Sequence, residues 1–519
     1  MNEDAQVNRD TDAGTSSGAH EDADGVRAKG GGPAGNATVV LDVSQWKYLS
    51  AESPDPQMHA ILSVEAHGTR SGGGARPALA QVLVLDCSGS MGYPQEKLRA
   101  AHQAAVAALR MLPDGTPFAV VQGTRSADMI YPAAPAMVRA DPRQRAAAEA
   151  AVHRLVAGGG TCFGSWLDLA RRLLARADAP IGHVLLVTDG KNQHDGAMPL
   201  TEVLEACAGR FVCDAWGIGD GWDARELLRI TGRLHGQASA VREAAELPHA
   251  YERLMRRLLV KSVPEVVVSV RPVPGAKVRY LKQVFPTRTD LAPVGAGPDG
   301  TLRFVTRAWG DEARRYHLCL AADPVGRPRG EDLQLAVVSV DVPGGDGVEV
   351  TPPLPCVVHW TDDAALSGHS DVHVEHFELH RMVADAVRAA TDAHRGGLRE
   401  AAERHLGTAV RLARRIGPGE PLDWLEPLVD LDGVEEGRVR LRPGVAAIDF
   451  EHALIGSARS TYTPGPADGS APACSAISTD DVRDAVPATA PANCPNCGER
   501  TDATGNFCTS CSAALRRRP

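Results

Sequence analysis

The strongest constraint on this chain is a ten-residue run in which a buried strand ends in alternating polar side chains. Residues 82–91 read Val-Leu-Val-Leu-Asp-Cys-Ser-Gly-Ser-Met, and the four apolar residues predict a buried strand. Asp86, Ser88 and Ser90 follow it and offer hard oxygen ligands of the kind that Mg²⁺ or Mn²⁺ prefers. Open α/β sheets bind ligands at the carboxyl ends of their strands, so this run predicts a ligand site there.

Two later segments extend the same pattern. Residues 158–161 read Gly-Gly-Gly-Thr and lead into an amphipathic helix, so Thr161 offers a third hydroxyl. Residues 183–190 read His-Val-Leu-Leu-Val-Thr-Asp-Gly, a second buried strand that ends in Asp189. Two carboxylates and three hydroxyls therefore follow one another along the chain at predicted strand and helix ends.

These three motifs, in this order, resemble the von Willebrand factor type A (vWA) domain and its metal-ion-dependent adhesion site, over about residues 78–260. The resemblance implies that Ser88, Ser90 and Thr161 ligate Mg²⁺ or Mn²⁺ directly, and that Asp86 and Asp189 act mostly through water. It also implies an open sixth position for an Asp or Glu side chain of a partner protein. The alternative is a domain with the right fold whose site no longer binds metal.

Length and charge limit the classes of function. A chain of 519 residues predicts several domains, and 43% apolar residues can form real cores. The net charge of −10 argues against bulk electrostatic binding to nucleic acid or anionic lipid. Residues 1–37 lack an apolar leader segment and no apolar run approaches the length of a membrane span, so we expect a cytoplasmic protein.

Four cysteines near the end form two Cys-x-x-Cys pairs, which predict a structural Zn²⁺ site and resemble the small zinc-ribbon modules of bacterial proteins. They are Cys494, Cys497, Cys508 and Cys511. So short a segment has almost no core, so zinc would supply its folding energy. Redox-active pairs are the alternative reading, and the absence of a surrounding thioredoxin-like pattern disfavours it.

The fold class we expect is multidomain α/β, with a doubly wound Rossmann-like vWA domain inserted in an antiparallel β-sandwich, followed by a helical hairpin and a zinc ribbon. The insertion is expected because strands within 38–70 alone could not bury a face. The expected parts are a disordered acidic N-terminus (1–37), N-terminal strands of the sandwich (38–77), the vWA domain (78–260), the remaining sandwich (261–362), a helical region (369–455), a flexible linker (456–490) and the zinc ribbon (491–515).

The linker contains Thr461 and Thr463, two candidate phosphorylation sites in Ser-Thr-Tyr-Thr-Pro. An inert spacer is the more common role of such a stretch.

No nucleotide fingerprint or nucleophile–base set occurs in a recognisable context, so we expect a non-enzymatic adaptor that binds another protein through the metal. The chain resembles bacterial proteins that act together with a MoxR-type AAA+ ATPase, or with a Ser/Thr kinase or PP2C phosphatase. The resemblance implies a partner of one of these kinds. Two alternatives stay open: a nucleic-acid-associated zinc-ribbon factor, which the net charge disfavours, and a substrate-recruiting subunit of a chelatase-like AAA+ ATPase.

Overall fold

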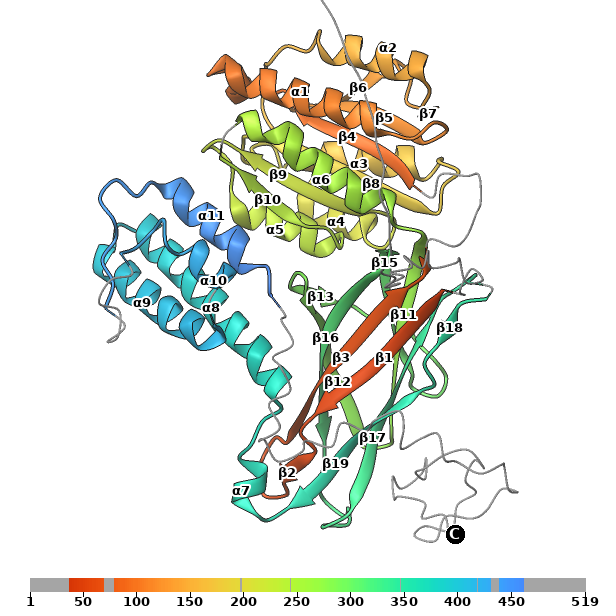
Figure 1. The fold of residues 1–519 in the computed structure, drawn as a ribbon, viewed down its shortest axis with the longest axis vertical. Coiled ribbons are helices and arrows are strands. Elements are labelled where there is room, and N and C mark those ends of the chain that lie inside the picture. The colour runs from red at the N-terminus through yellow and green to blue at the C-terminus, as the bar shows by residue number, and fades with distance from the viewer. Residues whose placement is uncertain are drawn as a thin grey trace, which may run out of the picture. The chain divides into compact units, whose positions relative to one another are not determined.

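The computed structural model describes residues 37–69, 79–196, 198–242, 244–345, 347–417, 419–430 and 438–461. They form an α/β domain, a two-sheet region and a helical region (Figure 1). Among these residues, no helix is long and apolar enough to cross a membrane.

The α/β domain is built on a mixed sheet with the strand order β10-β9-β8-β4-β5-β6, and β7 also pairs with β5. The strands from β10 to β5 run parallel, whereas β6 and β7 are antiparallel to β5. The strands are β4 (Leu79–Asp86), β5 (Pro117–Gly123), β6 (Ala127–Tyr131), β7 (Val138–Arg139), β8 (Ile181–Thr188), β9 (Val212–Ile218) and β10 (Ala238–Val241).

Helices cover both faces of this sheet because its central strands are apolar on both sides. In β4, Val82 and Val84 pack with α3, α4 and α5, whereas Leu83 and Leu85 pack with α1, α2 and α6. The helices are α1 (Gln95–Met111), α2 (Pro142–Val152), α3 (Phe163–Leu174), α4 (Leu200–Cys207), α5 (Ala224–Arg233) and α6 (Leu247–Leu259), with short 3₁₀ turns η2 (Gly89–Gly92) and η3 (Ala244–Glu246).

The two-sheet region consists of two six-stranded sheets that share one apolar core. The first has the order β13-β12-β16-β3-β1-β18 and the second β14-β15-β11-β17-β19-β2. The strands are β1 (Thr38–Gln45), β2 (Tyr48–Ser50), β3 (Gln57–His67), β11 (Val263–Pro272), β12 (Ala276–Phe285), β13 (Thr289–Leu291), β14 (Gly295–Ala296), β15 (Leu302–Trp309), β16 (Glu312–Ala322), β17 (Asp332–Asp341), β18 (Glu349–Val350) and β19 (Leu354–Thr361).

Strands from before and after the α/β domain meet in this region. β3 precedes that domain in the chain and pairs antiparallel with β16, which follows it. The expectation of purely antiparallel sheets was wrong at two edges, because β1 runs parallel to β18 and β19 runs parallel to β2. Alternation of apolar residues indicates a strand face but carries no information on the direction of its neighbour.

The helical region is a long hairpin followed by shorter elements. The side chain of Asp371 caps the first helix by accepting hydrogen bonds from the backbone N–H groups of His373 and Val374. Gly397 has a positive φ of 73°, which the turn between the two long helices requires. The helices are α7 (Ala364–Ser367), α8 (Val372–Arg395), α9 (Arg399–Ile416), α10 (Glu420–Asp423) and α11 (Ala447–Ser457).

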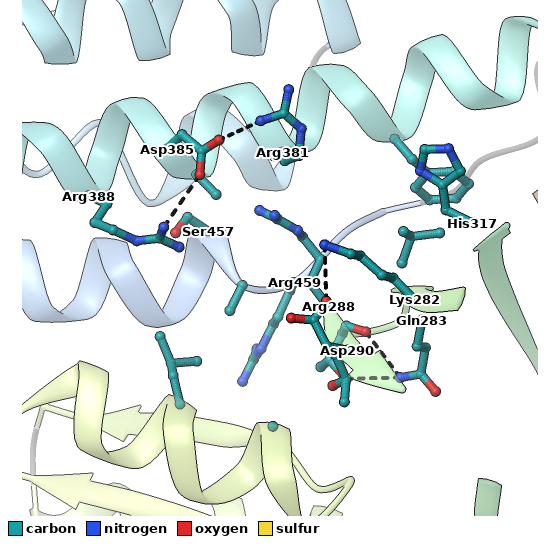
Figure 2. Close-up of a pocket in the computed structure, with 18 of the residues that line it drawn as sticks. Lys282, Gln283, Arg288, Asp290, His317, Arg381, Asp385, Arg388, Ser457 and Arg459 are labelled. Carbon is teal, nitrogen blue, oxygen red and sulfur yellow. Dashed lines mark hydrogen bonds and ion pairs between the residues drawn. The ribbon is translucent and has the colours of Figure 1, made fainter. Parts of the chain in front are cut away.

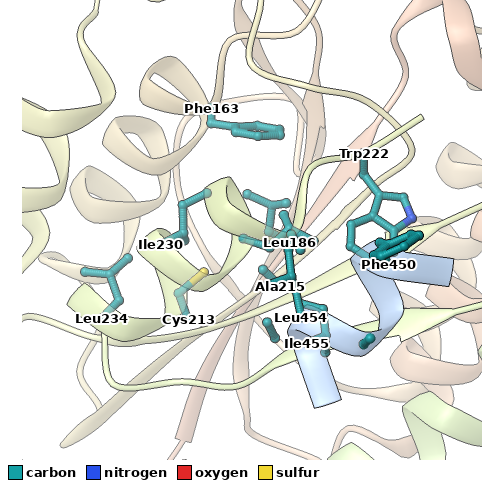
Figure 3. Close-up of a cluster of buried hydrophobic side chains, with 14 of the residues drawn as sticks. Phe163, Leu186, Cys213, Ala215, Trp222, Ile230, Leu234, Phe450, Leu454 and Ile455 are labelled. Carbon is teal, nitrogen blue, oxygen red and sulfur yellow. The ribbon is translucent and has the colours of Figure 1, made fainter. Parts of the chain in front are cut away.

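Two kinds of contact involve α8 and α11. With α5 and the β12–β13 hairpin they line a cavity rich in charged side chains (Figure 2). Phe450, Leu454 and Ile455 of α11 also join the buried apolar cluster that contains Trp222 of the α/β domain (Figure 3). In addition, the buried carboxylate of Glu451 accepts a 2.9 Å hydrogen bond from the first N–H of α5, at Ala224. The helical region therefore packs against the side of the α/β domain that carries α5.

Candidate functional site

The five side chains singled out in the sequence lie where two neighbouring strands of the α/β sheet end. Asp86 is the last residue of β4, and Asp189 directly follows β8. β4 and β8 are hydrogen-bonded and parallel, with Leu85 opposite Val187, so their carboxyl ends lie side by side. Ser88 and Ser90 occupy the loop and turn after β4.

Hydrogen bonds connect four of these side chains into one group. Asp86 accepts from the Ser88 backbone N–H at 2.7 Å, and its other oxygen accepts from the Thr188 hydroxyl at 2.5 Å. The Ser88 and Ser90 hydroxyl oxygens are 3.0 Å apart. The Ser90 hydroxyl donates to Asp189 at 2.7 Å.

Thr161 joins the same group from the loop before α3. It is 1% exposed, and it faces Gly190, the residue after Asp189. A methyl group added at Gly190 would lie 3.3 Å from the Thr161 hydroxyl oxygen, 3.6 Å from an Asp86 carboxylate oxygen and 3.7 Å from the Ser90 hydroxyl oxygen. Oxygen atoms from two chain segments, the end of β4 with its following turn and the loop before α3, therefore surround one small space beside Gly190.

The two carboxylates of this group are buried, whereas Ser90 is exposed. Asp86 and Asp189 are both fully buried, and burial raises the pKa of the Asp86 carboxyl to about 6, with a further contribution from Asp189. Hydrogen bonds from Ser88 and Thr188 act in the opposite direction on this pKa. A cation placed among these oxygens would offset the cost of burying two carboxylates.

The donor set fits a hard divalent cation. Two carboxylates and three hydroxyls are the oxygen ligands that Mg²⁺ or Mn²⁺ accepts, and Mg²⁺ commonly keeps some of its waters. Among the described residues, no group of three or more His, Cys, Asp or Glu side chains could hold a metal.

Comparison with known proteins agrees with this architecture. A family model described as a von Willebrand factor type A domain matches residues 80–240. A solved von Willebrand factor type A protein from Catenulispora acidiphila is 30% identical, with a TM-score of 0.73, over 83% of this chain and 99% of that one. The chain belongs to the von Willebrand factor type A family. Domains of this family typically mediate protein–protein interactions, are generally non-catalytic, and commonly bind a divalent metal.

Other solved structures show weaker likeness to this vWA protein. The ArnB paralog VWA2 from Sulfolobus acidocaldarius is 12% identical, with a TM-score of 0.49, over 82% of this chain and all of that one. A proximal thread matrix protein from the mussel byssus, solved with zinc in its metal-ion-dependent adhesion site, is 18% identical, with a TM-score of 0.31, over 36% of this chain and 46% of that one. A comparison with curated proteins gave no match.

Two residues of the vWA site were missed by sequence reasoning. Thr188 is the last residue of β8, and its hydroxyl fixes one Asp86 oxygen. Lys97, in the first turn of α1, places its ammonium 3.1 Å from the Asp189 carboxylate and 3.5 Å from that of Asp220. The sequence offers only a weak indication of the role of Lys97, which is a lysine seven residues after Ser90 in the helix that follows the loop.

The remaining predicted residues lie apart from the vWA site or outside the described residues. The backbone carbonyl of Thr461 accepts a 2.8 Å hydrogen bond from a ring nitrogen of His376. Thr463 and the four cysteines predicted to bind zinc lie outside the described residues; these are Cys494, Cys497, Cys508 and Cys511.

Proposed function

We propose that this protein is a non-catalytic adaptor that binds another protein through a divalent metal at the vWA site. Ser88, Ser90 and Thr161 would hold Mg²⁺ or Mn²⁺ directly, and Asp86 and Asp189 would hold it mostly through water. The single observation that carries the proposal is the convergence of Thr161, Asp86 and Ser90 oxygens around the space beside Gly190. An Asp or Glu side chain of the partner would complete the metal shell.

The charge of the donor set supports an acidic partner. Two carboxylates shared with the Lys97 ammonium leave a divalent ion incompletely neutralised, so a third carboxylate is attracted. Bound metal supplies a fixed positive charge that orients the partner's carboxylate. The rest of recognition falls to the loops around it, since one ligand bond alone does not select a partner.

We further infer that the C-terminal four-cysteine motif is a zinc ribbon and adds a second contact. A tethered second module raises avidity through effective concentration. We also interpret the vWA domain as an insertion in a β-sandwich; the antiparallel pairing of β3 with β16 supports this division. A nucleic-acid factor and an ATPase-linked subunit are not favoured by the family likeness, and the former also opposes the net charge of −10.

The test is a pull-down from native lysate with Mg²⁺ present, using full-length wild type, Asp86→Ala and Glu202→Ala. Glu202 is an exposed carboxylate on α4 and serves as the matched control. Mutation is preferable to chelation, because a chelator would also remove zinc from the four-cysteine motif. We expect a partner that is captured by wild type and Glu202→Ala and lost with a folded Asp86→Ala. The same captured proteins with all three would contradict the proposal.

A further inference from the structure

A second feature of the molecule is a cavity of about 990 Å³ whose walls contain none of the five residues proposed to hold the metal. Its walls come from α5 of the vWA domain, the β12–β13 hairpin of the two-sheet region, α8, and the end of α11 with the residues that follow it (Figure 2). This volume lies in the range of cavities that hold small molecules.

The cavity concentrates positive charge in an acidic chain. Seven cationic side chains line it against three acidic ones, Asp290, Glu378 and Asp385. The cationic residues are Arg225, Arg229, Arg288, Arg381, Arg388, Arg459 and Lys282. The excess of four positive charges stands in a protein whose net charge is −10.

The acidic residues of the wall are already engaged. Lys282 pairs with Asp290 at 3.2 Å, and Arg381 and Arg388 share Asp385 at 2.7 Å and 3.5 Å. Arg381 also contacts Glu378 at 2.7 Å. The three carboxylates are therefore used by cations on their own strand pair or helix.

Arg288 stands between β12 and β13 without such a partner. Its backbone N–H donates to the carbonyl of Ala458 at 3.0 Å, which fixes this segment against the end of α11. Within the described part of the chain, its half-buried guanidinium makes no hydrogen bond or ion pair. Burial lowers the pKa of the Arg288 guanidinium, and Arg388 and Arg381 lower it further, whereas Asp385 and Glu378 raise it. A partly desolvated guanidinium whose carboxylate neighbours are not in direct contact is costly, and an anion in the cavity would offset that cost.

We propose that this cavity binds a small anion that carries at least two phosphate groups, with Arg288 as a central contact. Guanidinium groups donate paired hydrogen bonds to phosphate oxygens, and arginines outnumber lysines six to one in the wall. Arg225 pairs with Asp392 outside the wall, which lowers the excess from four positive charges to three, about the charge of a diphosphate. Because the walls belong to three parts of the chain, the ligand would also hold these parts together.

The test uses inorganic pyrophosphate as the probe and the full-length chain. Isothermal titration is run in a chloride buffer without divalent cations, so that the probe is not complexed and the vWA site cannot bind it through a metal. We expect saturable binding by wild type that weakens as salt rises. Arg288→Met should weaken binding about tenfold or more. Arg411→Met, which removes an exposed arginine from α9, should bind within about twofold of wild type.

Citrate is titrated in parallel to distinguish phosphate from carboxylate chemistry. Binding of pyrophosphate well above that of citrate, lost in a folded Arg288→Met, supports the proposal. Absence of pyrophosphate binding by wild type, equal binding by Arg288→Met, or equal affinity for citrate would overturn it.

Discussion

The vWA site and the basic cavity have opposite charge and opposite construction. At the vWA site, two buried carboxylates and three hydroxyls gather at the ends of strands that are hydrogen-bonded to each other. In the cavity, seven cations gather from separate elements of three parts of the chain. The first arrangement favours a cation and the second an anion. The net charge of −10 describes neither site, which shows that local geometry decides what each can bind.

His317 in the cavity wall should make the chain less stable in acid. His317 is buried, with His59, Glu378, Lys282 and Arg381 around it; burial and His59 lower its pKa to about 4. The unfolded chain then binds a proton near pH 6.5, and the folded chain only near pH 4, so stability is full above 6.5 and is lost as pH falls through this window. The loss is about 3 kcal/mol.

His317→Gln should remove this part of the acid sensitivity. Chemical unfolding between pH 7 and pH 4 measures it, with the exposed His249→Gln as the control. Parallel stability curves for wild type and His317→Gln would show that His317 does not titrate in this way.

A methyl group in the vWA site should exclude the metal without removing any ligand. Gly190→Ala places a carbon within 3.7 Å of oxygens from Thr161, Asp86 and Ser90. We expect Mn²⁺ affinity to fall about 30-fold, or about 2 kcal/mol. Gly196→Ala, whose added methyl meets nothing within 4 Å, is the control. Unchanged affinity in Gly190→Ala would place the metal elsewhere.

Lys97 should lower the affinity of the vWA site for a metal ion, because its ammonium already partly neutralises the Asp189 carboxylate. Removing this charge with Lys97→Met should tighten Mn²⁺ binding about tenfold, or about 1.4 kcal/mol. The exposed Lys277→Met should leave the affinity unchanged. Weaker binding in Lys97→Met would mean that Lys97 supports the ligands rather than opposing the metal.

Removing the charge of Arg288 gives the smallest expected effect on stability. Without an anion, Arg288→Met should stabilise the chain by about 1 kcal/mol, because it removes a half-buried cation that has no carboxylate in direct contact within the described residues. Urea unfolding in a phosphate-free buffer measures the difference, with Arg411→Met as the reference. A lower stability of Arg288→Met would show that the packing of the arginine side chain stabilises the fold by more than the burial of its charge costs.

Sequence reasoning could predict the vWA sheet because each part of its signal is local. The apolar runs that became β4 and β8 end in Asp86 and Thr188-Asp189, and neighbouring parallel strands bring such ends together without any long-range information. The same reasoning missed Lys97, because only the start of α1 relative to the loop decides where that side chain reaches.

The cavity lay beyond sequence reasoning for a physical reason. Its arginines are spread from position 225 to position 459, and no local pattern brings them together. Strand direction failed likewise at the β1–β18 and β19–β2 pairs, where short edge strands carry too few residues to specify a partner. The predicted zinc-ribbon residues lie outside the described residues, so that site stays a prediction.

The most direct test of the central claim is Mn²⁺ binding to the full-length, zinc-loaded chain, followed by the electron paramagnetic resonance signal of free Mn²⁺. Wild type is compared with Asp86→Ala, and folding of both is verified by circular dichroism. The vWA metal site predicts that wild type takes up one more Mn²⁺ per chain than Asp86→Ala. Equal uptake by the two folded proteins would contradict it.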